Sequence, residues 1–167
     1  MSLQNKVVLR AVLVALAMIF SWIEAQIPYP IPGAKLGLTN LVVLIALYRL
    51  SMGDAIGINI IRILLVGLTF GNMFSLVYSI TGGILSSLIM ILMKKNDKFH
   101  VITVSLAGGI VHNIGQILVA VYVLETKAMV SYLPVLWITG MSAGIIVGIL
   151  GSMVLKRLPE NILKLQG

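Results

Sequence analysis

Residues 28–40, PYPIPGAKLGLTN, are the one stretch dense in proline and glycine in an otherwise apolar chain, and they decide how the segments on either side can fold. Three of the first five residues are prolines, whose fixed φ of about −65° and missing N–H stop a helix from continuing. Gly33 and Gly37 then allow a sharp re-entry. Irregular backbone is tolerated at membrane depth only where protein buries it or where it lines a wet cavity. The stretch, which carries Lys35 and Asn40, is therefore predicted to form a lid or wall of a binding site.

The composition of the chain is that of an integral membrane protein. Of its 167 residues, 59% are apolar and 10% are charged, and the mean hydropathy is +1.09. A soluble domain would carry about 25% charged residues. The chain has no cysteine, which excludes a disulfide framework, a thiolate nucleophile and a cysteine-based metal site. The first apolar segment has no small-residue cleavage site followed by a soluble domain, so we interpret it as a retained span.

The apolar residues fall into six segments, which predict an all-α integral membrane protein with a single transmembrane domain over residues 1–167. A membrane-spanning helix needs about 17–25 residues. The second segment is short, and Asp54 is placed to act as the N-cap of the third. We therefore expect a bundle of six transmembrane helices. The segments lie near residues 6–27, 36–50, 54–70, 73–94, 100–124 and 130–155.

The net charge of +7 follows the positive-inside rule rather than indicating nucleic-acid binding. If the N-terminus is cytoplasmic, Lys35 and Lys127 are the only basic residues expected on the outer side of the membrane. We therefore expect both termini in the cytoplasm and the lipid bilayer, not nucleic acid, as the surroundings of the protein. The basic residues expected inside are Lys6, Arg10, Arg49, Lys94, Lys95, Lys98, Lys156, Arg157 and Lys164.

Small residues recur every four positions in two segments. The sixth segment has Gly140, Gly144 and Gly148, with Ser152 following, and the first segment has an Ala-x-x-x-Ala pair at residues 11 and 15. Such stripes let two helices approach closely in a membrane. The simpler interpretation of these stripes is packing between helices within the chain. The more specific interpretation is contact with a partner subunit.

Polar residues inside the apolar segments are costly in hydrocarbon and normally face the interior of a bundle. At about 1.5 Å of rise per residue, most of them fall in the outer half of the membrane, with His112 nearer the middle and Arg62 below them. They predict an outward-facing polar pocket with a cationic floor, suited to an anionic or carbonyl-rich ligand. In a plainer account, Arg62 pairs with Glu24 and His112 is an interhelical hydrogen-bonding group. The candidate substrate-binding residues are Glu24, Lys35, Asn40, Arg62, Tyr78, Ser79, His112, Asn113 and Gln116.

An ordered set of motifs along nearly the whole chain resembles the Gx transporter family, which is also labelled heptaprenyl diphosphate synthase component I. One departure is Thr39, where a small residue such as alanine is expected. The motifs are Pro32-Gly33-x-Lys35-Leu36-Gly37-Leu38-x-Asn40, Arg62, Phe70-Gly71, Ser79-x-x-Gly82-Gly83, His112-Asn113-x-Gly115-Gln116 and Tyr132-Leu133-Pro134.

The resemblance implies a fold and a set of partners. The family is grouped with the substrate-binding S components of energy-coupling-factor (ECF) transporters, which have six helices and both termini in the cytoplasm. In those proteins an Ala-x-x-x-Ala patch on the first helix meets a transmembrane coupling subunit, and Ala11 and Ala15 match it here. ATPases of the same module drive transport, and the first extracellular loop helps to close the substrate site.

The residue types that are present and absent help to distinguish between the possible functions. A prenyl diphosphate synthase needs aspartate clusters that hold Mg²⁺, and this chain has only Asp54 and Asp97. It also lacks a phosphate-binding Gly-x-x-x-x-Gly-Lys-Ser/Thr loop. We therefore expect no enzyme activity and no cofactor, but an S component in a bacterial cell membrane that captures an extracellular vitamin-like or quinone-precursor-like small molecule. One alternative is a non-catalytic accessory subunit of heptaprenyl diphosphate synthase that binds a prenyl or quinone intermediate. Another is a proton-coupled carrier that uses His112 and Glu24, although no inverted repeat is evident.

Overall fold

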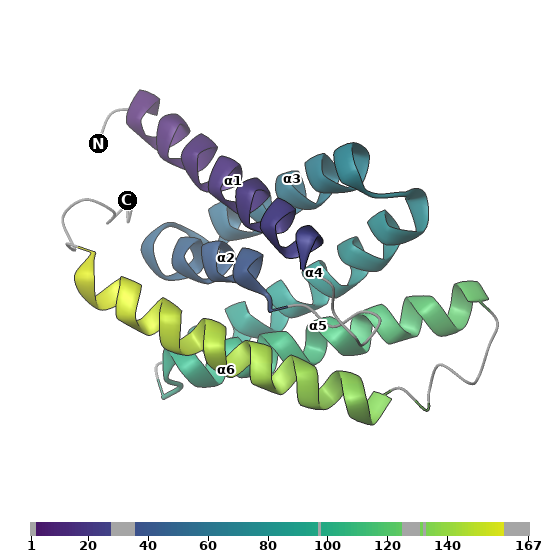
Figure 1. The fold of residues 1–167 in the computed structure, drawn as a ribbon. Coiled ribbons are helices and arrows are strands. Elements are labelled where there is room, and N and C mark those ends of the chain that lie inside the picture. Colours follow the sequence, from purple (N-terminus) through teal and green to yellow (C-terminus); the bar gives the residue numbers. More distant parts are fainter. Residues whose placement is uncertain (1–2, 28–35, 97, 125–130, 132, 159–167) are drawn as a thin grey trace.

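The computed structural model describes residues 3–27, 36–96, 98–124, 131 and 133–158, and over these residues the chain is helical, without a strand (Figure 1). The predicted all-α class is therefore confirmed, and the predicted segments agree with the helices to within a few residues. Lys35, Asp97, Lys127 and Tyr132 lie outside the described residues, as does most of the predicted lid. The helices are α1 Leu3–Gln26, α2 Leu38–Arg49, α3 Met52–Phe70, α4 Met73–Lys94, α5 Val101–Leu124 and α6 Leu133–Arg157.

The helices differ in length, and the shortest one is in the centre. Within the described residues, five helices are long and apolar enough to cross a membrane, so the chain is a multi-pass membrane protein. α2 has 12 residues, about 18 Å at 1.5 Å per residue, which is shorter than a hydrocarbon core of about 30 Å. It lies between α1 and α6 in Figure 1 and also contacts α3. Its Val42 and Leu44 have no exposed surface, which makes α2 the buried axis of the bundle.

Basic residues from several helices meet at one end of the bundle, which we call the basic end. Arg10 of α1 forms an ion pair with Asp54 of α3 at 2.6 Å. Arg49, at the end of α2, donates to two carbonyl oxygens at the C-terminal end of α6, that of Leu155 and that of Leu158, the latter at 2.9 Å. Lys94, at the end of α4, donates to the carbonyl of Leu47 in α2. The structure thus places these basic residues at one end, and its cytoplasmic orientation remains a prediction.

The start of α3 differs from the sequence prediction. Ser51, not Asp54, is the N-cap: its hydroxyl accepts a hydrogen bond from the backbone N–H of Asp54 at 3.0 Å. The carboxylate of Asp54 accepts in return from the N–H of Ser51 at 3.3 Å. This reciprocal capping box satisfies two backbone donors at once, which explains why the helix begins at Met52 and not at the predicted residue 54.

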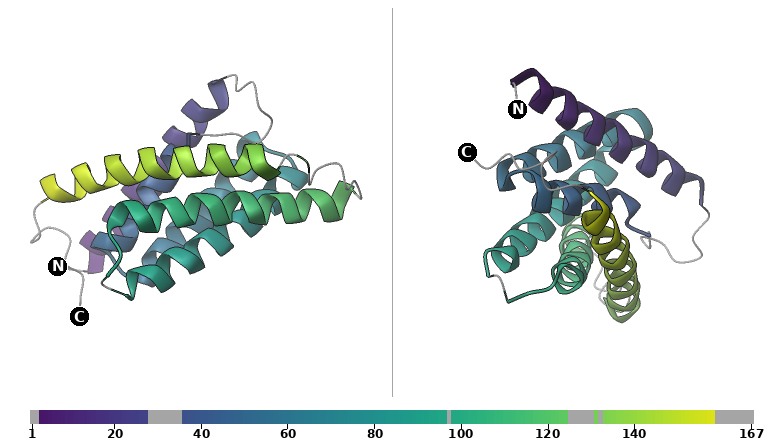
Figure 2. Two further views of the ribbon diagram at one scale, coloured as in Figure 1. Left: turned by 90° about the horizontal axis from the view of Figure 1, so that it is seen from below. Right: turned by 90° about the vertical axis from the view of Figure 1, so that its left-hand side faces the viewer.

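The glycine stripe of the sixth segment packs inside the chain. A Cβ added at Gly144 would lie 2.8 Å from Cα of Leu106, and one added at Gly148 would lie 2.8 Å from Cα of Ile102, both on α5. Figure 2 shows α5 and α6 running side by side along their length. The plainer interpretation of this stripe is therefore confirmed. Ala11 and Ala15 are instead exposed on α1, and their contact with a coupling subunit remains a prediction.

Candidate functional site

A cavity of about 190 Å³ lies among the helices, and all six contribute to it or to its edge. Seven of the nine predicted binding residues line it: Glu24, Asn40, Arg62, Ser79, His112, Asn113 and Gln116. Tyr78 does not, because its ring packs beside that of Phe74 with centroids 5.7 Å apart. Lys35 lies outside the described residues. The other lining residues are Ser21, Ala25, Gly37, Thr39, Ile63, Val66, Gly67, Gly71, Ser75, Gly109, Gly140 and Ala143.

The N-terminus of α2 lies at the wall of this cavity and is capped by a residue from another helix. Gly37 is the N-cap position, with a left-handed φ of 77° that a glycine adopts without strain. Because it has no side chain, the cap comes from Glu24 of α1, whose Oε1 accepts from the N–H of Leu38 at 3.0 Å. Oε2 of Glu24 accepts from the hydroxyl of Thr39 at 2.9 Å. A buried carboxylate at this position is also favoured by the helix dipole.

Glu24 does not form an ion pair with Arg62 within the described residues. Both oxygens of Glu24 bind groups at the start of α2, and the ion pairs within 4.0 Å among the described residues do not include one to Arg62. Thr39, the departure from the family pattern, is one of the two donors, and its hydroxyl also lies 3.2 Å from that of Ser21. Neither Ser21 nor this role of Thr39 could be predicted from the sequence, because only the fold brings residues 21, 24 and 39 together.

Arg62 is oriented by a polar network between α3 and α4. Its Nη2 donates to Oδ1 of Asn59, one turn earlier on α3. The amide nitrogen of Asn59 donates to the carbonyl of Gly83 at 3.1 Å and to the hydroxyl of Ser87 at 2.9 Å, both on α4. Asn59 is only 3% exposed, so these bonds hold its amide in one orientation. Asn59 was not among the predicted binding residues, although it lies on the same helical face as Arg62.

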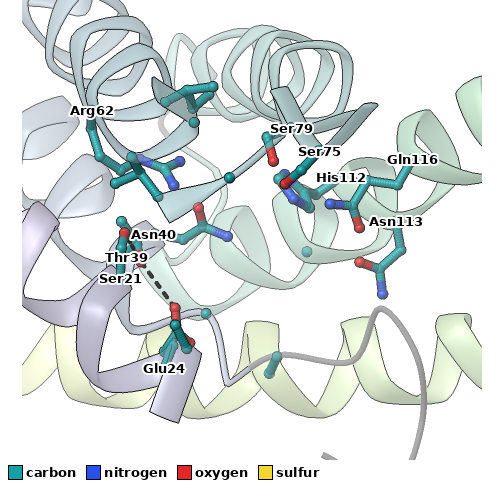
Figure 3. A pocket seen from close by; sticks show the side chains of 18 of the residues that line it. Ser21, Glu24, Thr39, Asn40, Arg62, Ser75, Ser79, His112, Asn113 and Gln116 are labelled. Atoms are coloured by element: carbon teal, nitrogen blue, oxygen red, sulfur yellow. Dashed lines mark hydrogen bonds between the residues drawn. The ribbon is translucent and has the colours of Figure 1, made fainter. Parts of the chain in front are cut away.

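Several polar groups in the cavity wall have hydrogen-bonding capacity that the described residues do not use. Nε of Arg62 is buried without a partner, and Figure 3 shows the guanidinium directed into the cavity. The carboxamides of Asn40 and Gln116 make no hydrogen bond within the described part of the chain, although Gln116 is only 2% exposed. Nε atoms of Arg10 and Arg49 also lack partners at the basic end. Arg62 differs from them because it lines a cavity together with the carboxamides of Asn40 and Gln116.

The α5 side of the cavity depends on close packing by glycines. A Cβ added at Gly82 of α4 would lie 2.8 Å from the carbonyl oxygen of His112, and one added at Gly115 would lie 3.0 Å from Cα of Gly82. The two helices can therefore approach closely enough to put Ser79 and His112 on one wall. Asn113 is fixed from the other side, since its Nδ2 donates to the carbonyl of Leu136 in α6 at 2.6 Å.

The arrangement is suited to binding a polar molecule inside an apolar bundle. Buried polar groups in proteins are nearly always hydrogen-bonded, so a wall with unused donors and acceptors indicates room for a ligand or ordered water. Asp54 lies at the basic end in its ion pair, away from these residues. Within the described ranges, His, Asp and Glu do not form a group of three or more that could hold a metal ion.

A comparison with protein families found a match that covers most of the chain. Residues 13–154 match the family described as heptaprenyl diphosphate synthase component I. The matched range contains every residue that lines the cavity. Neither a search of curated proteins nor a search of solved structures found a match.

Proposed function

We propose that this chain, which belongs to the heptaprenyl diphosphate synthase component I family, is the substrate-binding subunit of a membrane importer. It would act as an S component of the energy-coupling-factor type in a bacterial cell membrane. Its cargo would be a small molecule from outside the cell, resembling a vitamin or a quinone precursor. The transmembrane coupling subunit and the ATPases would be separate proteins.

The observation that supports this proposal most is the cavity with unused hydrogen-bonding capacity. A buried polar group without a partner costs about 1–3 kcal/mol, and this cost applies to Nε of Arg62. The carboxamides of Asn40 and Gln116 line the same cavity and make no hydrogen bond within the described residues. Such groups recover this cost when a complementary ligand enters. Intramembrane ionisable residues mark substrate sites by default, which agrees with Arg62 as the principal contact.

The remaining lining residues have distinct roles in this proposal. Asn113, Gln116, Ser79 and His112 would contact the cargo from α4 and α5. Glu24 would shape the site by capping α2 rather than by binding cargo directly, because both of its oxygens already have partners. Lys35, in the preceding stretch, remains a predicted contact.

Docking on a coupling subunit is the second part of the proposal. Ala11 and Ala15 lie on an exposed face of α1, where small side chains would let a partner helix approach closely. The same face carries large exposed apolar side chains, including Val8 at 60% and Val12 at 55%, so it is compatible with either lipid or a membrane partner.

Native mass spectrometry of the full-length protein, extracted in a mild detergent, tests the binding role. We expect a small polar molecule to travel with the wild type and to be lost from Arg62→Ala and from Gln116→Ala. Ser142→Ala is the control, since this exposed hydroxyl bonds only the Ile138 carbonyl of its own helix. Retention of the molecule by both cavity variants would contradict the proposed site, and absence of ATP-dependent uptake by the tagged complex in proteoliposomes would contradict the importer role.

A second candidate function is favoured by the family description itself. The chain would be a non-catalytic membrane subunit that holds a prenyl or quinone intermediate for a separate synthase. A heptaprenyl chain is several times larger than benzene, which a cavity of about 150 Å³ holds. It would therefore extend from the 190 Å³ cavity between helices into lipid. Co-purification of a polyprenyl diphosphate, together with stimulation of synthase activity by the added protein, would select this function.

A further inference from the structure

We infer that the cavity takes a compact, single-ring-sized molecule that carries one negative charge at one end and a hydrogen-bonding edge at the other. This inference rests on the proposed binding function and names the chemical class of the cargo. It follows from the size of the cavity, from the charges in its wall and from the way its polar groups are distributed.

The size of the cavity sets the first limit. Its volume of about 190 Å³ is slightly larger than the roughly 150 Å³ cavity that accommodates benzene. One ring with two short substituents is compatible with this space. A fused multi-ring cofactor or a long isoprenoid is not, unless most of it remains outside the cavity.

The charges in the wall set the second limit. Among the described lining residues, Arg62 and Glu24 are the only Asp, Glu, Lys or Arg side chains. The N-terminus of α2 adds a partial positive charge of about half a unit. Glu24 is already bound to that helix terminus, whereas Arg62 has a buried Nε without a partner. One carboxylate on the ligand would therefore match the single positive charge of Arg62, which has no ion pair among the described residues.

A diphosphate does not fit these charges. It carries at least two negative charges, and proteins usually neutralise them with Mg²⁺ held by carboxylates or with several cations. The described wall offers one guanidinium, and its one carboxylate has both oxygens occupied. A prenyl diphosphate headgroup would therefore leave negative charge without a partner inside the bundle, which is costly.

The distribution of polar groups sets the orientation of the molecule. Figure 3 shows Arg62 and Glu24 on one side of the cavity, and Asn113 and Gln116 on the opposite side. Nδ2 of Asn113 is used by the carbonyl of Leu136, which leaves its Oδ1 as an acceptor, and the amide of Gln116 can donate and accept. This pair matches an edge with adjacent donor and acceptor groups, such as a carboxamide or a lactam.

Asn59 is a positioning residue for the charged end. Its three hydrogen bonds link Arg62 to Gly83 and Ser87 of α4, so the guanidinium is oriented before the ligand arrives. A group that is already ordered loses less conformational freedom on binding. A single rigid arginine can thus select a planar carboxylate over a neutral amide of the same shape.

The test uses a matched compound library and the full-length protein in nanodiscs. Single-ring carboxylates are pooled with their primary amides and with phosphate and diphosphate esters of the corresponding alcohols, and retained compounds are identified by affinity-selection mass spectrometry. We expect retained compounds to be monocarboxylates that bind about 10- to 100-fold more tightly than their amides, the ratio expected for losing a hydrogen bond to a charged group. This comparison is made on the wild type and needs no variant.

Two variants sharpen the result. Arg62→Gln should abolish the preference for carboxylate over amide, while Gln116→Ala should weaken both members of a pair equally. Ser142→Ala is the folding control, and size-exclusion profiles confirm that each variant is intact. Lys35→Gln tests the other predicted cationic contact: the carboxylate preference should fall less than in Arg62→Gln, and an equal or larger fall would overturn the assignment to Arg62.

Each contrary outcome has a defined meaning. Retention of amides as strongly as acids, or of diphosphates more strongly than acids, overturns the charge inference and leaves the binding function standing. A carboxylate preference unchanged in Arg62→Gln overturns the assignment to this residue. If no compound is retained by intact protein, the inference fails. If monocarboxylates bind but no ATP-dependent uptake follows, the importer function fails and the inference stands.

Discussion

The cavity and the basic end use the same kinds of polar residue in different ways. At the basic end, Arg10, Arg49 and Lys94 each bind an atom from a different helix or its end, so these cations connect α1 to α3, α2 to α6 and α4 to α2. In the cavity, the partner of Arg62 is Asn59 on its own helix, and the rest of the guanidinium faces open space. Polar groups that connect helices maintain the fold, whereas polar groups that face a void are available to a ligand.

Glu24 is an exception to this difference, because it lies in the cavity wall but has a structural role. Its substitution is expected to have the largest effect on stability. Glu24→Ala removes the acceptor for two groups at the start of α2 and leaves Arg62 without a compensating charge nearby. A hydrogen bond to a charged group contributes about 1.5–3 kcal/mol, so we expect a loss of at least that size in the free energy of unfolding by SDS titration. Glu24→Gln, which keeps one acceptor, should lose less. Wild-type stability in Glu24→Ala would show that α2 does not depend on this cap.

Arg49 tests whether the basic end is structural only. Arg49→Gln removes the charge-assisted bonds to the carbonyls at the C-terminal end of α6, and such bonds contribute about 1.5–3 kcal/mol each. We expect reduced thermal stability with unchanged ligand affinity, measured on the same preparation. Arg49→Lys should recover part of the stability, because it keeps the charge near the helix C-terminus. Weakened ligand binding in Arg49→Gln would show that the basic end is not only structural.

The glycine contact between α5 and α6 supports the cavity from behind. Gly144→Ala places a Cβ 2.8 Å from Cα of Leu106, a backbone atom that cannot rotate away. Overpacking of this kind costs about 1–3 kcal/mol, which a thermal melt in detergent can detect. Gly57→Ala is the matched control, since a Cβ there meets nothing within 4 Å. Equal effects of the two substitutions would mean that close helix approach is not what the stripe provides.

The ion pair between Arg10 and Asp54 should have the smallest effect. The side chain of Arg10 is 43% exposed and that of Asp54 is 10% exposed. Pairs with an exposed partner typically contribute about 0.2–1 kcal/mol and are screened by salt. Arg10→Gln should therefore lower stability slightly at low salt and not at high salt, with no change in ligand binding. A loss of stability as large as that of Glu24→Ala would contradict the small contribution expected for this ion pair.

Much of the site could be predicted because the membrane makes polar residues informative. An amide or arginine in an apolar segment must face the bundle interior, so Asn40, Arg62, Asn113 and Gln116 were identifiable before the fold was known. Tyr78 was also predicted to bind the substrate, but it does not line the cavity, and its ring packs beside that of Phe74. Ser21 and Asn59 were missed as parts of the site, because their roles depend on contacts with Thr39, Gly83 and Ser87.

The sequence by itself determined the all-α membrane class, the approximate helix boundaries and the inward-facing polar residues. These follow from local hydropathy, helical period and the cost of polar groups in hydrocarbon, none of which requires knowledge of distant contacts. Only the tertiary structure decided that α2 is a short buried helix, that Glu24 caps it and that Asn59 orients Arg62. The reason is that a capping or positioning bond joins residues that are close only after the helices pack, so its donor and acceptor leave no periodic signal in the chain.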